Sequence, residues 1–244
     1  MLHVDDAGSG RLPVVFVHSF AGSSSHWKAQ LAHLRTQRRE IALDLRAHGA
    51  SIVDEGAWYD VLDFAADIGA VVDSLGLDRF VLVSHSLGGA VALVYAGTHA
   101  DRIAGLVLVG APGCVPAAMS EPIIAALESA KYQEVMDDYM KQLTAGAMSG
   151  VAQEVDAGVK RISRAQSLAI IKATFAYDPM APLANYRGPT LSITAASEAD
   201  AEIALHNLSP SIEHNSISGT SHWVQTDRPD VFNAMLDLFL NRVS

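Results

Sequence analysis

The most informative ten residues of the chain are Val81–Ala90, with the sequence VLVSHSLGGA. The first of them are apolar and mostly β-branched, which is typical of a buried strand, and the residues that follow predict a helix over Leu87–Thr98. Ser86 stands between the two, where the chain has to turn sharply, and Ser84 and Gly88 on either side are small enough to relieve crowding between strand and helix. A strand that leads directly into a helix is the unit from which α/β proteins are built.

The same alternation of strand and helix extends on both sides of this segment. Short apolar runs predict strands over Val14–His18, Ile41–Leu45, Phe80–Val83, Gly105–Val109 and Thr190–Thr194, with a weaker pattern at Ile212–Ile217. Helical spacing predicts helices over Ala29–Arg35, Tyr59–Leu75, Ala201–Leu208 and Asp230–Leu240. This alternation implies right-handed crossovers, and therefore a mostly parallel sheet flanked by helices on both faces.

The pattern changes between residues 115 and 187, where no segment has the features of a strand. Four helices are predicted instead, over Glu121–Ala130, Tyr132–Leu143, Ala152–Arg161 and Ala165–Ala176. Asp178, Pro179 and Pro182 should end this series, because proline does not continue a helix. We therefore expect one α/β core made of residues 1–114 and 188–244, interrupted by a helical insertion of residues 115–187.

Composition and charge exclude several classes of protein. Half of the 244 residues are hydrophobic, which fits a folded domain, and the formal charge of −10 argues against a nucleic-acid partner or an anionic membrane surface. No apolar stretch approaches the ~20 residues that a membrane span needs. The single cysteine, Cys114, cannot form an internal disulfide, and the first ten residues do not have the pattern of a signal peptide. We expect a cytoplasmic protein, and the sequence does not indicate an oligomeric state.

Ser86 is the candidate nucleophile. The run Ser84-His85-Ser86-Leu87-Gly88 is similar to the G-x-S-x-G nucleophile elbow, with Ser84 in place of the first glycine. Such a turn lifts the serine hydroxyl clear of the sheet and puts the Leu87 N–H where an oxyanion would develop. A serine that only caps the helix is the alternative, but strand, turn and helix follow here in the order that catalysis requires.

With the elbow, four other segments resemble those of the α/β-hydrolase superfamily. They are Val14–Trp27 (its H-G-x loop), Asp44–Ser51 (D-x-R-G-H-G-x-S), Gly188–Glu198 (P-T-L-x-x-x-G-x-x-D) and Gly219–Trp223 (the histidine loop). They occur in the family's order, with small residues at Ser19, Ser84 and Ala195 where glycine is usual. The resemblance spans nearly the whole chain outside residues 115–187. It implies the α/β-hydrolase fold, with the helical insertion as a cap over the active site.

The resemblance also assigns roles to individual residues. The backbone N–H groups of Phe20 and Leu87 would form the oxyanion hole, and His222 would act as general base for Ser86. His18 would order the oxyanion loop by hydrogen bonding, and the Asp44–Ser51 segment would be structural.

Two carboxylates compete for the acid that orients His222. Glu198 stands at the position of the family's aspartate, and Asp200 follows two residues later. Glu198 is favoured, because a glutamate can hold the imidazole tautomer and stabilise its cation as an aspartate does. The alternative is that both are surface acids.

These features predict a serine hydrolase that cleaves small, largely apolar carboxylic esters through an acyl-enzyme. Lactone hydrolysis, carbon–carbon bond hydrolysis and cofactor-free perhydrolase or haloperoxidase-like chemistry use the same residues and remain alternatives. A small-ligand receptor of the same fold with slow turnover is an alternative of another class. No cofactor and no metal is expected, since no ligand spacing suggests either.

Five methionines fall in the predicted cap: Met119, Met136, Met140, Met148 and Met180. Methionine adapts to irregular apolar ligands, so these residues suggest an apolar pocket for an acyl or alkyl group. Packing among the cap's own helices is the competing interpretation.

Overall fold

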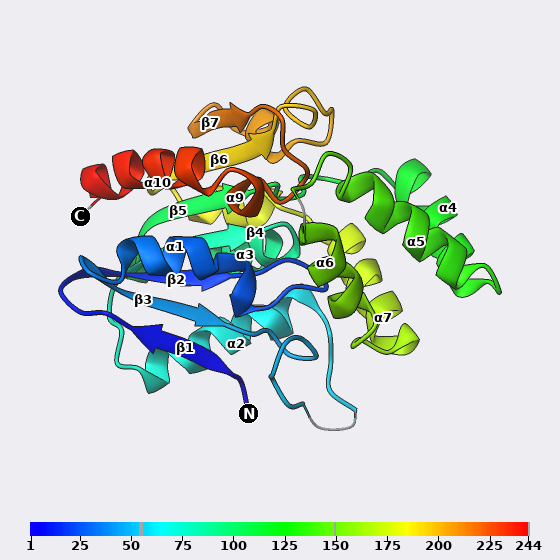
Figure 1. Cartoon of the computed structure of the whole chain (residues 1–244), viewed down its shortest axis with the longest axis horizontal. Helices are drawn as coiled ribbons and strands as arrows, with labels where there is room; N and C mark the ends of the chain where they lie inside the picture. Colours follow the sequence, from blue (N-terminus) through cyan, green and yellow to red (C-terminus); the bar gives the residue numbers. More distant parts are fainter. Residues whose placement is uncertain (54–55, 149, 244) are drawn as a thin grey trace.

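The centre of the computed structural model is a seven-stranded sheet in the order β1-β3-β2-β4-β5-β6-β7 (Figure 1). The strands are β1 (Val4–Ala7), β2 (Arg11–Val17), β3 (Arg38–Leu43), β4 (Phe80–His85), β5 (Ile103–Val109), β6 (Thr190–Ala195) and β7 (Ile212–Ile217). β1 runs antiparallel to β3 and the other pairs are parallel, which confirms the mostly parallel sheet. The structure describes residues 1–53, 56–148 and 150–243, so residue 149 of the predicted insertion and residues 54, 55 and 244 of the predicted core lie outside it.

Two apolar layers cover the faces of the sheet. In β2, Val15 and Val17 pack into one layer, whereas Val14 and Phe16 pack into the other, as expected when side chains alternate along a strand. The helices α2 (Val61–Ser74) and α3 (Leu87–Thr98) cover the first face, and α1 (Lys28–Leu34) and α10 (Pro229–Val243) cover the second (Figure 1). Burial on both faces explains why the central strands are continuous apolar runs in the sequence.

Five helices of the described residues connect β5 to β6; the first four lie beyond the carboxyl ends of the parallel strands (Figure 1), whereas the fifth packs against the end of α3. They are α4 (Ala117–Glu128), α5 (Tyr132–Leu143), α6 (Val151–Val159), α7 (Arg164–Ala176) and α8 (Met180–Asn185). The prediction that the series ends at Pro182 was wrong, because α8 contains this proline. Pro182 is the third residue of α8, where the N–H group that proline lacks would have no acceptor within the helix.

The predicted helix over Ala201–Leu208 is also wrong. Only a 3-10 turn at Leu205–Leu208 forms there. The Gly113 N–H donates to the Ile203 carbonyl at 3.1 Å, and Pro112 pairs with Ala204 as an antiparallel bridge. The backbone groups that a helix would use are thus taken up by the loop after β5.

The antiparallel strand β1 was not predicted, because it has four residues, two of them acidic. Its carboxylates form ion pairs across the edge of the sheet, from Asp6 to Arg39 at 2.8 Å and from Asp5 to Arg35 at 3.4 Å. Within the described residues, no helix combines the length and the apolar character that crossing a membrane requires.

Candidate active site

Ser86 lies at the turn between β4 and α3 with φ +53° and ψ −117°, in a region that non-glycine residues rarely occupy. The turn is held in place because the Ser86 N–H donates to the Val109 carbonyl at 2.8 Å. A Cβ at Gly88 would lie 2.5 Å from the His18 carbonyl oxygen, so only glycine lets α3 start this close to the loop after β2. The hydroxyl of Ser84 donates to the Val107 carbonyl within the sheet at 3.2 Å.

The loop after β2 brings Phe20 to the same end of the sheet. His18 orders this loop as predicted, since its Nδ1 donates to the Ser19 carbonyl at 2.8 Å and its Nε2 accepts the Leu45 N–H at 2.9 Å. Burial lowers the pKa of His18 well below its ordinary value, so the ring is neutral. The backbone N–H groups of Phe20 and Leu87 donate no hydrogen bond to any described residue, and both can serve a ligand.

His222 lies on the loop between β7 and the short helix α9 (Val224–Asp227). Its Nδ1 lies 2.8 Å from Oε1 of Glu198, on the loop after β6. Asp200 makes no hydrogen bond to His222 within the described part of the chain, and its charge instead acts on His214. The structure therefore places Glu198, the favoured acid, against the His222 imidazole, and Asp200 does not contact this ring.

The ring of His222 packs against the backbone beside Ser86. A Cβ at Gly110 would lie 2.7 Å from Cε1 of His222, and Gly110 directly follows the residue that binds the Ser86 N–H. Nε2 of His222 is buried and has no hydrogen-bond partner among the described residues. This nitrogen is consequently free to take a proton from a neighbouring hydroxyl.

The main chain around His222 is fixed from two directions. Its N–H donates to the carbonyl of Leu143, the last residue of α5, at 3.0 Å, and its carbonyl lies 3.0 Å from Nε2 of His85. The buried carboxylate of Asp227 accepts the Ser221 N–H at 2.7 Å and the Met148 N–H at 2.6 Å. The histidine loop is thus bound both to the elbow and to the helical insertion.

Residues of the insertion near the site were missed by sequence reasoning. Burial raises the pKa of Tyr139 on α5, and the negative charge of Glu198 raises it further. Leu143, one turn further along the same helix, supplies the carbonyl to His222. No local pattern marks either residue, because only the packing of α5 against the core brings them to the site.

The Asp44–Ser51 segment has the structural role that was predicted for it. Asp44 accepts the N–H groups of Ser24 at 2.6 Å and Ala50 at 2.8 Å, and Arg46 forms a two-pronged ion pair with Asp67 at 2.7 and 2.8 Å. His48 is buried, and its Nε2 has no partner among the described residues. Burial lowers the pKa of His48 to about 4.

This buried imidazole makes the fold sensitive to acid. The unfolded chain takes up a proton at His48 near pH 6.5, whereas the folded chain does so only near pH 4, so protons favour unfolding in between. The free energy of unfolding is therefore unaffected by protonation of His48 above pH 6.5. It falls as the pH declines from 6.5 towards 4, by about 3 kcal/mol in all. We expect urea unfolding at pH 7.5 and 5.0 to show a smaller pH-dependent loss in His48→Gln than in wild type. An unchanged loss in His48→Gln, with the exposed-site control His99→Gln behaving as wild type, would contradict this.

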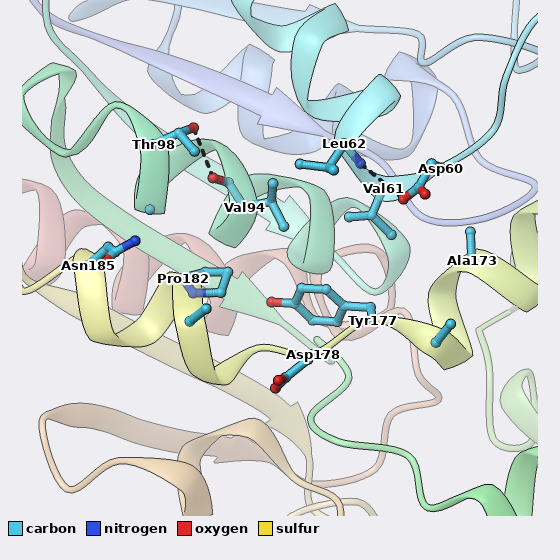
Figure 2. A pocket seen from close by; sticks show the side chains of 13 residues that line it. Asp60, Val61, Leu62, Val94, Thr98, Ala173, Tyr177, Asp178, Pro182 and Asn185 are labelled. Carbon is cyan, nitrogen blue, oxygen red and sulfur yellow. Dashed lines mark hydrogen bonds between the residues drawn. The ribbon is translucent and has the colours of Figure 1, made fainter.

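A cavity of about 410 Å³ lies apart from these residues (Figure 2). It opens between the start of α2, the end of α3 and the segment that joins α7 to α8, with Tyr177 and Pro182 among its lining residues. Ser86, His222 and Glu198 do not line it. The cavity is therefore not where these three residues would act.

The methionines of the insertion differ in their surroundings. Met136 is fully buried with Leu127 and Ile171, so packing among the helices accounts for it. Met119, Met148 and Met180 are about half exposed, and Met140 lies between two apolar clusters. In the described part of the chain, no group of three or more histidine, cysteine or acidic side chains is arranged to hold a metal ion.

Comparison with known proteins gives matches over nearly the whole chain. The model of the alpha/beta hydrolase family matches residues 14–235. The chain is 27% identical over 258 residues to the sn-1-specific diacylglycerol lipase of Mus musculus, a match covering 96% of this chain and 82% of the lipase. It is 46% identical to the non-heme haloperoxidase of Rhodococcus erythropolis, over 43% of this chain and 39% of that protein. The solved structure of Est816, described as an N-acyl homoserine lactone degrading enzyme, has the same fold, with a TM-score of 0.85, 24% identity and coverage of 98% of this chain and 96% of that one.

Proposed function

The chain belongs to the alpha/beta hydrolase family, and from this premise we propose that it is a serine hydrolase that cleaves small, largely apolar carboxylic esters. The observation that carries the proposal is the state of His222. One of its ring nitrogens is bound to Glu198 at 2.8 Å, and the other is buried and free beside the elbow that presents Ser86. This is the arrangement that a general base needs, with one nitrogen oriented and the other available.

In the first half of the proposed reaction, Ser86 Oγ attacks the ester carbonyl carbon while His222 Nε2 takes its proton. The negative charge on the carbonyl oxygen is stabilised by the N–H groups of Phe20 and Leu87. When the tetrahedral intermediate collapses, the carbon–oxygen bond to the alcohol breaks and the imidazolium returns the proton to the leaving oxygen. Glu198 stabilises the imidazolium and keeps the proton of the neutral ring on Nδ1.

The second half repeats these steps with water. His222 removes a proton from water, the hydroxide attacks the acyl carbon, and Ser86 leaves with the proton that His222 returns. The carboxylic acid is released and the free serine is restored. No further reactant is needed for the sequence to balance.

Apolar side chains around the site favour an uncharged acyl group. Phe20 packs against the cluster formed by α4, α5 and α7, while Leu143 and Met140 pack in the cluster around Trp223. A lactone is a cyclic ester, which the same steps would open. Because Est816 is described as degrading N-acyl homoserine lactones, lactones are the second class of substrate to consider.

Turnover of p-nitrophenyl acetate, butyrate and octanoate tests the proposal, with Ser86→Ala as the matched blank. We expect repeated turnover by the wild type, a preference within the acyl series, and a rate for Ser86→Ala close to that of buffer. A fluorophosphonate should modify Ser86 stoichiometrically, as read by mass spectrometry of the peptide. If the wild type hydrolyses these esters no faster than Ser86→Ala, the proposal of a serine hydrolase is contradicted. Stoichiometric labelling together with a single slow turnover would favour the receptor alternative.

A further inference from the structure

His85, the residue before the nucleophile, is fully buried and makes two hydrogen bonds. Its Nε2 lies 3.0 Å from the main-chain carbonyl of His222, and its Nδ1 lies 3.2 Å from the side-chain amide nitrogen of Gln225. The rings of His85 and His222 also pack together, with centroids 4.8 Å apart. The mechanism described above does not use His85.

The two partners of His85 determine its proton. A carbonyl oxygen can only accept a hydrogen bond, so Nε2 must carry the proton and donate it to His222. Nδ1 therefore has a lone pair, which the Gln225 amide satisfies by donating. Burial lowers the pKa of His85 well below its ordinary value, and the nearby His222 lowers it further, which is consistent with a neutral ring.

Gln225 is itself held in position from the other side. Its main-chain carbonyl accepts a hydrogen bond from the side-chain amide of Gln30 on α1 at 3.0 Å, and the same amide donates to Asn233 on α10. The support of His85 thus extends into the two helices that cover one face of the sheet. A group held this firmly can fix the position of what it binds.

We propose that His85 is a positioning residue, which holds the main chain of His222 by its Nε2–H and thereby aims the imidazole at Ser86. The inference rests on the proposed function, in which His222 is the base. His222 has its N–H bound by Leu143 and its carbonyl bound by His85, so these two bonds together set the height and tilt of the ring. Loss of the second bond lets the ring move relative to both Ser86 and Glu198.

Two substitutions at this position separate hydrogen bonding from packing. His85→Phe keeps an aromatic ring against His222 but removes both hydrogen bonds, whereas His85→Gln keeps an N–H donor near the place of Nε2. We expect His85→Phe to lower kcat on the order of 10- to 100-fold with KM little changed, because small displacements of catalytic groups are costly. His85→Gln should retain most of the wild-type kcat. The control His99→Phe, at an exposed position directly after α3, should match the wild type.

A second measurement does not depend on turnover. The proton NMR signal of His222 Nδ1–H, assigned by its loss in His222→Ala, reports the bond to Glu198. We expect this signal to shift or broaden in His85→Phe and to be kept in His85→Gln. If no ester is turned over but the signal behaves in this way, the proposed function fails and the positioning role stands.

Other outcomes would overturn the positioning role. An unchanged kcat and an unchanged signal in His85→Phe would do so, as would equal losses in both variants with a lowered Tm, since packing alone would explain them. If His85→Phe does not fold, His85→Met also removes the Nε2–H donor while filling apolar space. An unchanged kcat and signal in that variant would also overturn the proposal.

Discussion

Replacing His222 by alanine is expected to lower kcat for ester hydrolysis on the order of 10⁴- to 10⁶-fold, with a much smaller change in KM. Without the imidazole, Ser86 keeps its proton and is a poor nucleophile at neutral pH, and the leaving alcohol has no acid to protonate it. Substrate binding depends on other groups, so the loss should fall on the chemical step. Steady-state rates with the ester that the wild type prefers measure the effect, expressed per mole of folded protein.

The position of the histidine is what matters in this comparison. His99→Ala, which removes an exposed ring stacked on Tyr95 at the end of α3, should leave kcat as in wild type. The double variant Ser86→Ala/His222→Ala should be no slower than either single variant, because residues that act as a unit do not contribute additively. A His222→Ala enzyme that keeps more than about a tenth of wild-type kcat would remove His222 from the mechanism.

The second large effect is expected at the acid. Glu198→Gln should lower kcat on the order of 10²- to 10⁴-fold, because the amide no longer stabilises the imidazolium and can hold the wrong tautomer. The side chain of Glu198 is 31% exposed, and solvent therefore compensates for part of the lost charge. Asp200→Asn is the matched control, since it makes the same change two residues away without a contact to His222. A larger loss in Asp200→Asn than in Glu198→Gln would reverse the assignment.

The sequence predicts the parts of the fold that depend on local pattern. The buried strands β2, β4 and β5 contain continuous apolar runs, and the turn at Ser86 is marked by the small residues Ser84 and Gly88. Elements that depend on distant contacts were not predictable in this way. The segment Ala201–Leu208 has helical spacing, but its backbone pairs with the loop after β5.

The same distinction between local pattern and distant contacts applies to the residues of the candidate site. Ser86 and His222 could be found because their surroundings in the sequence resemble known motifs. The choice between Glu198 and Asp200 depends on the path of the loop after β6, and counting residues along the loop does not give that path. His85, Tyr139 and Leu143 could not be found at all, because the relation of each to the site depends on His222 or Glu198, which are distant in sequence.

The bond between the His222 N–H and the Leu143 carbonyl joins main chain to main chain. Substitutions along α5 can therefore reshape the wall above the site and leave the support of the base untouched, so substrate preference can diverge while proton transfer is conserved. Adding or deleting one residue in α5 is a different matter, because it turns the following part of the helix by about 100° and carries this carbonyl away. We therefore expect α5 to tolerate substitutions of its side chains better than insertions or deletions that change its length.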